Sequence, residues 1–323
     1  MYDIKPKTLY HWYRNYLSDY RQDKESGKWL KEKIPIADKN TGEILHELPV
    51  YVVKPENIGE SMAIDDKQIG RDTFTIMTNQ QTGKIAMLVE TLKAEELQMG
   101  AALLGEVTHK IKSISCDMSP SYLKFIESCF KQSSIVIDKF HVVRYVLEAL
   151  QDVRRRMKAQ IMEQLPKGKG SRKTPQNEQL LSALELLRRS KYMLTQSQTN
   201  WTEIQKELSQ QLFQRFPEIK NAYQLSEHFK NWYDRSNAVK PKIILEQELY
   251  QWYELVEESR LKEFVNVVKM IEKHEENILN YFQRKQTNAK AENMNGKIQR
   301  FITNNFGVRD KDFTLYRIAN YFS

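Results

Sequence analysis

The chain has 323 residues, of which 40% are hydrophobic and 11% aromatic, so it can bury a core and is not wholly disordered. Its formal charge of +8 makes a polyanion such as nucleic acid a candidate partner. The two cysteines, Cys116 and Cys129, exclude a disulfide framework and a four-cysteine zinc site. No apolar run is long enough for a membrane span and the N-terminus has no signal-peptide core, so we expect a soluble, cytoplasmic protein.

Residues 1–57 are expected to form an N-terminal helical and linker segment. Tyrosines recur at helical spacing in residues 8–22 and predict one amphipathic helix there. A short apolar strand is expected at 48–53.

Residues 58–165 alternate between apolar strands and amphipathic helices. The pattern predicts three antiparallel strands with tight turns, then two more strands, each reached through a helix, and a last helix. The strands are expected at 61–66, 73–78, 84–89, 111–116 and 134–137, and the helices at 94–109, 122–130 and 141–165. This order is that of the ribonuclease H-like fold, an α/β architecture with a mixed five-stranded sheet and flanking helices.

An all-helical insertion is expected over residues 166–284, beginning with a basic loop at 167–173. Residues 285–323 then return to the first domain with a helix at 290–302 and a short terminal helix. The excess positive charge lies beside these boundaries, with a net +6 in residues 141–176 and +5 in residues 283–323.

Three carboxylates lie where this fold brings its elements together. Asp65 is expected near the end of the first strand, Asp117 ends the fourth, and Glu292 lies in the first turns of the last long helix. Such a cluster could hold two divalent cations about 3.5–4 Å apart, the arrangement used for in-line phosphoryl displacement. Oxygen ligands suit Mg²⁺ or Mn²⁺. Side chains alternate along a strand, so only one of Asp65 and Asp66 can face this site.

Each acid also has an ordinary structural explanation. Asp117 alone would be an Asx-turn or a helix cap, Asp65 a solvated strand residue, and Glu292 a surface residue favoured near a helix N-terminus. The functional interpretation depends on their occurring together.

Four segments in this order closely resemble the DDE transposases of bacterial insertion sequences in the ISL3 family. They are SMAIDDKQIGRDTFTIMTNQQTGKIAMLVE, ISCDMSPSYLKFI, IVIDKFHVVRYVLEALQDVRRRM and TNAKAENMNGKIQRFITNNFGVRDKDFTLYRI, covering about residues 61–160 and 285–322. The resemblance implies a ribonuclease H-like catalytic domain that cuts and rejoins DNA at transposon ends with Mg²⁺. Asp65, Asp117 and Glu292 match the three catalytic, metal-binding acids of the family.

The resemblance also includes a D-x-x-H motif formed by Asp138 and His141. Both are expected to be auxiliary residues that orient a phosphate or a water beside the active edge. The structural alternative is that Asp138 caps its helix and His141 packs.

The basic stretches are expected to contact DNA phosphates, which gives salt-dependent affinity without reading sequence. For any single one of these residues, a solvated helix face is the alternative. The expected DNA contacts are Arg154, Arg155, Arg156, Lys167, Lys169, Arg172, Lys173, Lys297, Arg300 and Arg309.

Members of the resembled family often begin with a cysteine-rich zinc module and a helix-turn-helix, and this chain has neither before its first acid. We therefore expect a separate partner protein to supply recognition of the transposon ends. A homo-oligomer is also expected, because two ends must be processed together. The rival functions are a nuclease of the same fold without strand transfer and an inactive DNA-binding remnant.

Overall fold

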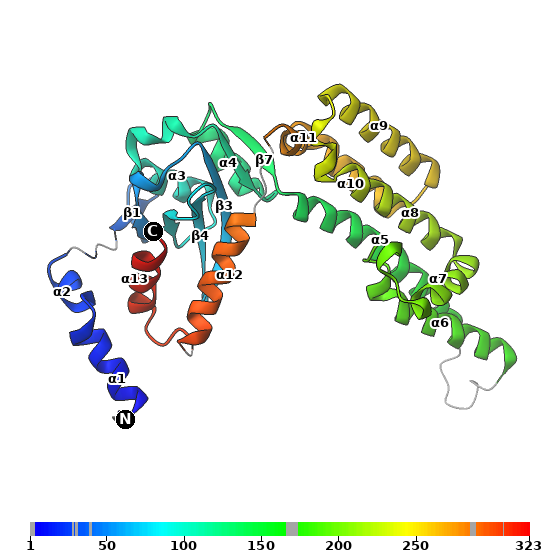
Figure 1. Cartoon of the computed structure of the whole chain (residues 1–323), viewed down its shortest axis with the longest axis horizontal. Helices are drawn as coiled ribbons and strands as arrows, with labels where there is room; N and C mark the ends of the chain where they lie inside the picture. Colours follow the sequence, from blue (N-terminus) through cyan, green and yellow to red (C-terminus); the bar gives the residue numbers. More distant parts are fainter. Residues whose placement is uncertain are drawn as a thin grey trace. The chain divides into compact units, whose positions relative to one another are not determined.

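The computed structural model describes residues 4–27, 29, 32–38, 41–165, 174–284, 289–305 and 307–323. They belong to two compact units, which Figure 1 shows with the elements labelled. The first unit comprises Met1–Asp138 and Gln286–Ser323, and the second comprises Lys139–Lys285.

The first unit is built on one mixed sheet with the strand order β1-β2-β5-β4-β3-β6-β7. The pairs β3–β6 and β6–β7 are parallel, and the other neighbours are antiparallel. The strands are β1 (Glu32–Ala37), β2 (Ile44–Val53), β3 (Ser61–Ile69), β4 (Asp72–Asn79), β5 (Ile85–Val89), β6 (Ser113–Cys116) and β7 (Ser134–Ile137). The five strands expected from residues 58–165 are therefore adjacent in the sheet, and the α/β class is confirmed.

The sheet has seven strands rather than five because part of the N-terminal segment joins it. The apolar half of β2 pairs with β5, so that Val50 lies opposite Val89. β1 then pairs with β2 as the outer strand. Buried residues at the end of β2 add to the core, so this segment is part of the domain rather than a linker.

Helices cover both faces of the sheet. On one face, α12 (Ala289–Asn304) and α13 (Lys311–Phe322) bury an apolar stripe that includes Met294 and Ile298 against Phe74 and Ile76 of β4. On the other face, α4 (Pro120–Cys129) brings the Tyr122 hydroxyl to 3.2 Å from the Thr75 hydroxyl. The helix α3 (Ala94–Ala102) packs beside α4, and both belong to the two crossovers.

Two expected helices are shorter than their patterns indicate. The N-terminal helix divides into α1 (Pro6–Trp12), a π-helical turn η1 (Tyr13–Leu17) and α2 (Tyr20–Glu25), because Ser18 between them is extended. The helix α3 ends at Ala102, and Gly105, with a φ of 67°, begins the 3₁₀ segment η3 (Gly105–Lys110). A positive φ is unfavourable for other residues and explains the break.

The second unit is helical in its described parts. Its α-helices are α5 (Lys139–Gln164), α6 (Pro175–Met193), α7 (Glu203–Arg215), α8 (Pro217–Trp232), α9 (Lys242–Ser259), α10 (Lys262–Lys273) and α11 (Glu275–Arg284). The long α5 packs on α6, α8 and α10, so the unit begins at Lys139, whereas the sequence pattern places the start of the insertion at residue 166. Among the described residues, no helix is both long and apolar enough to cross a membrane.

Candidate active site at one edge of the sheet

Three aspartates occupy equivalent positions on the parallel strands. Ser61 of β3 pairs with Ser113 of β6, and Asp65 and Asp117 each lie four residues beyond that pair. The last pair between β6 and β7 is Cys116 with Ile137, so Asp138 is level with Asp117. Neighbouring strands lie about 4.8 Å apart. The register therefore places three aspartates at the same level of the sheet, Asp65 within β3 and the other two directly after β6 and β7; they are called the carboxylate row below.

The helix α12 contacts the side chain of Asp65 and, of its neighbour Asp66, the backbone carbonyl, which accepts from Asn295 Nδ2 at 3.3 Å. Asn295 of α12 donates from Nδ2 to Asp65 Oδ2 at 2.6 Å, and the other Asp65 oxygen accepts the Asp66 amide at 2.9 Å. Asp66 pairs with Thr75, whose hydroxyl contacts Tyr122 on the opposite face. Asp65 lies four residues before the end of β3, because the hairpin with β4 continues to Ile69.

Asp117 lies between the end of β6 and the start of α4. Its Oδ1 accepts the backbone N–H of Ser119 at 2.9 Å, so the expected Asx-turn is present. This bond fixes the carboxylate in the turn that starts α4. The carboxylate thus has a structural role in addition to any catalytic one.

Glu292 is exposed in the first turn of α12. It precedes Asn295 by three residues, about 4.5 Å along the helix axis, on the same flank of the buried stripe. Within the described ranges, however, no three His, Cys, Asp or Glu side chains are close enough together to hold one metal ion. The structure therefore brings Asn295, rather than Glu292, into contact with Asp65.

The auxiliary pair is divided between the two units. Asp138 is 94% buried at the end of β7, and its backbone N–H donates to the Cys116 carbonyl at 2.9 Å. His141 is half-buried in the first turn of α5, where its ring meets Phe140 edge-on at 5.6 Å. Asp138 therefore belongs to the sheet unit, level with Asp117, whereas His141 belongs to the helical unit.

The donor chemistry at this edge fits a hard cation. Burial, followed by the charges of Asp117 and Asp138, raises the pKa of the Cys116 thiol well above its ordinary value. Burial likewise raises the pKa of Tyr122, whose hydroxyl stays protonated beside Thr75. The thiol and the phenol are therefore not anionic ligands, and the carboxylates supply oxygen donors, which Mg²⁺ and Mn²⁺ prefer.

Of the three consecutive arginines that were expected to contact DNA, one is buried and the other two are paired with carboxylates. Arg154 is 93% buried, and its guanidinium donates to Gln151 Oε1 at 2.7 Å and to the Leu187 carbonyl at 2.9 Å. Arg154 lies on the buried stripe of α5, so the prediction that it contacts DNA is wrong. Arg156 is held by Glu263 at 2.7 Å and by a second carboxylate. Arg155 is exposed and pairs with Asp152 of the same helix.

The C-terminal basic residues are better placed to meet DNA. Lys297, Arg300 and Arg309 are all exposed, and no ion pair of theirs occurs among the described residues. Lys297 and Arg300 are three residues apart on the solvent face of α12, opposite its buried stripe. Lys167, Lys169, Arg172 and Lys173 lie outside the described residues.

The sequence pattern did not identify Asn295 as a functional candidate. It lies three residues after Glu292 in AENMNGKI, a spacing that places both on one side of a helix. That spacing was the available indication. An asparagine attracts less notice than an acid because it has no charge.

Comparison with known proteins identifies one family. A family model described as a transposase, of the DDE type and the ISL3 group, matches residues 62–318, which is more than half of the chain. No curated protein and no solved structure matches the chain significantly.

Proposed function

Because the chain belongs to the ISL3 family of DDE transposases, we propose that it cuts DNA at the ends of an insertion sequence and joins the freed ends to a target. Membership of the family implies a ribonuclease H-like fold, which agrees with the sheet described above. The observation that supports the proposal is the parallel register of β3 and β6, in which Asp65 and Asp117 each follow the Ser61–Ser113 pair by four residues.

Asp65, Asp117 and Glu292 are the residues that would hold divalent cations, two Mg²⁺ or Mn²⁺ ions in this proposal. When bound, such ions stabilise the charge on the attacking and leaving oxygens of a phosphodiester. Asp138 extends the same row and stands beside the reacting groups. Glu292 lies on the helical turn that precedes Asn295 and would have to approach the two aspartates to complete the metal site.

The chain's other groups position these acids and the DNA. Asn295 holds one oxygen of Asp65, and the Ser119 amide holds one oxygen of Asp117, so both carboxylates are oriented before DNA arrives. Lys297 and Arg300 on the exposed side of the same helix bind backbone phosphates.

Two displacements follow each other at this edge. Water attacks the phosphorus at the element end, the bond to the 3′ oxygen breaks, and a 3′-hydroxyl and a 5′-phosphate result. The 3′-hydroxyl then attacks a target phosphodiester, forming one new bond and releasing a target 3′-hydroxyl. The second step consumes no water, because one phosphodiester replaces another.

The test uses the full chain and duplexes that carry the terminal repeats of its own element. Asp65→Asn, Asp117→Asn and Glu292→Gln are each expected to lower cleavage and the joining of pre-cleaved ends by about a hundredfold or more. Asp66→Asn is the matched control, since it removes the same charge one residue away on the opposite face, and it should keep near wild-type rates. Calorimetric titration with Mn²⁺ should show weaker binding in the first three variants only.

Each rival function has its own result. Cleavage without any joining of pre-cleaved ends would indicate a nuclease. Duplex binding with no cleavage and no Mn²⁺ binding in the wild type would indicate an inactive remnant. Wild-type rates in all three acid variants would refute the assignment of the site.

We also propose that the active form is a homo-oligomer and that a separate protein supplies recognition of the ends. Two ends must be processed together, and this requires at least two active sites or two binding surfaces. End-specific binding by this chain alone would contradict the proposed partner.

A further inference from the structure

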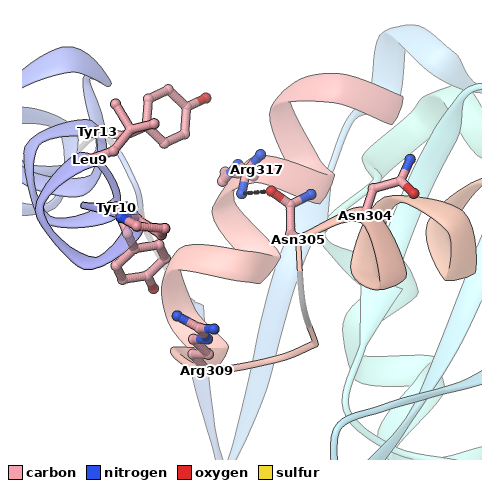
Figure 2. A pocket seen from close by; sticks show the side chains of 8 residues that line it. Leu9, Tyr10, Tyr13, Asn304, Asn305, Arg309 and Arg317 are labelled. Carbon is pink, nitrogen blue, oxygen red and sulfur yellow. Dashed lines mark hydrogen bonds between the residues drawn. The ribbon is translucent and has the colours of Figure 1, made fainter. Parts of the chain in front are cut away.

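A pocket of about 540 Å³ lies in the first unit, away from the carboxylate row. Figure 2 shows its two sides, with α1 and η1 on one and the end of α12 and α13 on the other. Aromatic contacts hold these segments together, since the rings of Tyr10 in α1 and Tyr13 in η1 both meet Phe313 of α13 edge-on. An ion pair between Arg14 and Asp310 at 2.7 Å joins the same elements. The pocket is thus part of the packed fold.

Its lining carries two positive charges, Arg309 and Arg317. Neither makes an ion pair with the described residues, and no acid lines the pocket. Arg317 is fixed by a hydrogen bond to Asn305 Oδ1 at 2.9 Å and lies over the ring of Phe301, 4.6 Å from its centroid. This bond uses one of its five N–H donors, so the others can bind an anion. The charge of the lining fits a phosphate.

Aromatic and amide groups complete the lining. Tyr13 is covered on one side by Arg317, whose guanidinium carbon is 5.0 Å from the ring centroid, and 38% of its surface is exposed. Tyr10 forms another wall, and burial raises the pKa of its hydroxyl, which stays a proton donor. Asn304 lines the pocket, and its side chain is exposed. Its carboxamide can pair with the edge of a base.

The helix α12 runs from the candidate active site, where its Asn295 contacts Asp65, to this pocket, which its Asn304 lines. Lys297, Arg300 and Asn304 are exposed and follow one another at helical spacing on one flank of this helix. Glu292 and Asn304 are twelve residues apart in one helix, which corresponds to about 18 Å. A DNA strand advances about 3.4 Å per nucleotide, so this length spans about five nucleotides.

We propose that this pocket captures one unpaired nucleotide of the DNA, with its base against the ring of Tyr13 and its phosphate on Arg309 and Arg317. The proposal rests on the proposed function, because it names a second DNA site of the same enzyme. The strand would run along α12, with Lys297 and Arg300 on its phosphates, and place the captured nucleotide about five steps from the reacting one. Capture would fix the register of the strand at the active edge.

An acidic segment of a protein would satisfy the two arginines but would not use the exposed aromatic face. Stacking of a base on an aromatic ring is favourable for every base, so the pocket needs no particular sequence. The combination of ring, amide and two guanidinium groups therefore favours a nucleotide.

The experiment compares the binding of two fluorescent 20-base-pair duplexes to the full chain by anisotropy. One is blunt, and the other ends in two unpaired deoxyadenosines. The wild type should bind the second about tenfold more tightly, as expected for one stacked base with its phosphate. Tyr13→Ala should remove this preference and Arg309→Gln should reduce it to about threefold, whereas Tyr13→Phe should keep it. Arg189→Gln, an exposed charge of the helical unit, is the control for loss of one positive charge.

The possible outcomes separate this proposal from the function on which it rests. Equal binding of both duplexes by the wild type, with cleavage intact, would overturn the nucleotide pocket and leave the transposase proposal standing. Failure to bind either duplex would overturn both. Binding of a poly-glutamate peptide that Arg309→Gln abolishes, with no preference between the duplexes, would assign the pocket to an acidic protein segment. A preference that survives in Tyr13→Ala would also contradict the proposal.

Discussion

The contact between Asn295 and Asp65 allows a sharp test of how the site is held. Replacing Asn295 by Ala removes the 2.6 Å hydrogen bond to Asp65 Oδ2 and changes no charge. A hydrogen bond to a charged group contributes about 1.5–3 kcal/mol, and because this pair is only partly buried we expect the lower value. If the bond acts in the transition state, a loss of about 1.5 kcal/mol corresponds to about a tenfold lower rate.

The assay is the joining of pre-cleaved ends under single-turnover conditions, with the affinities for DNA and Mn²⁺ measured separately. Asn295→Ala should lower the rate about tenfold and weaken Mn²⁺ binding to a similar extent, because partners that orient a ligand affect both. The affinity for duplex DNA should stay unchanged. This division between rate and DNA affinity would distinguish a positioning residue from a DNA contact.

Asn293→Ala is the matched control. Asn293 lies on the exposed side of the same helix, so the same substitution should leave the rate and the Mn²⁺ affinity unchanged. A wild-type rate and wild-type Mn²⁺ affinity in Asn295→Ala would refute the reasoning. Equal losses in both variants would show that the helix, and not the hydrogen bond, is responsible.

Two further predictions concern stability, both measured by urea unfolding. Arg154→Ala should cost about 2–3 kcal/mol, since it removes the buried hydrogen bonds to Gln151 Oε1 and the Leu187 carbonyl and opens a cavity, whereas Arg155→Ala should cost at most about 0.5 kcal/mol; equal effects would contradict the burial of Arg154. Burial acts to raise the pKa of Glu96, but hydrogen bonds led by that from Thr91 outweigh it and hold the pKa below 4.5. The stability that Glu96 adds over Glu96→Gln should thus be present above about pH 4.5 and disappear as the pH falls through the lowered pKa; a difference that does not change with pH would contradict this.

Apolar periodicity was sufficient to predict the five central strands, because each is a short buried run bounded by turns. It could not show that β2 joins the sheet, since pairing of Val50 with Val89 is a long-range contact. Alternation along β3 predicted that the side chains of Asp65 and Asp66 lie on opposite faces, and the hydrogen bond from Asn295 shows that the Asp65 side chain lies on the face covered by α12. The register that aligns Asp138 with Asp117 depends on crossover geometry, which no local pattern contains.

The basic residues show a different limit. A run of three arginines suggests a surface by composition alone, but Arg154 lies on the helical stripe formed by Leu150, Val153 and Met157. A helical projection of α5 therefore indicates that it is buried. The role of Glu292 as a metal ligand remains a prediction. Its approach to Asp65 and Asp117 is a long-range contact, because the whole helical unit separates Glu292 from Asp117 in the sequence.

The interrupted course of the first unit has a consequence for how the protein is made. The helices that cover one face of its sheet, α12 and α13, follow β7 only after about 150 further residues. At 5–20 residues per second, a ribosome needs about 8–30 s to synthesise that stretch. During this interval α12 and α13 do not yet cover Phe74 and Ile76, and Glu292 has not yet been synthesised. Under the proposed assignment of Glu292, a polypeptide still lacking α12 would have an incomplete metal site and would not cleave DNA.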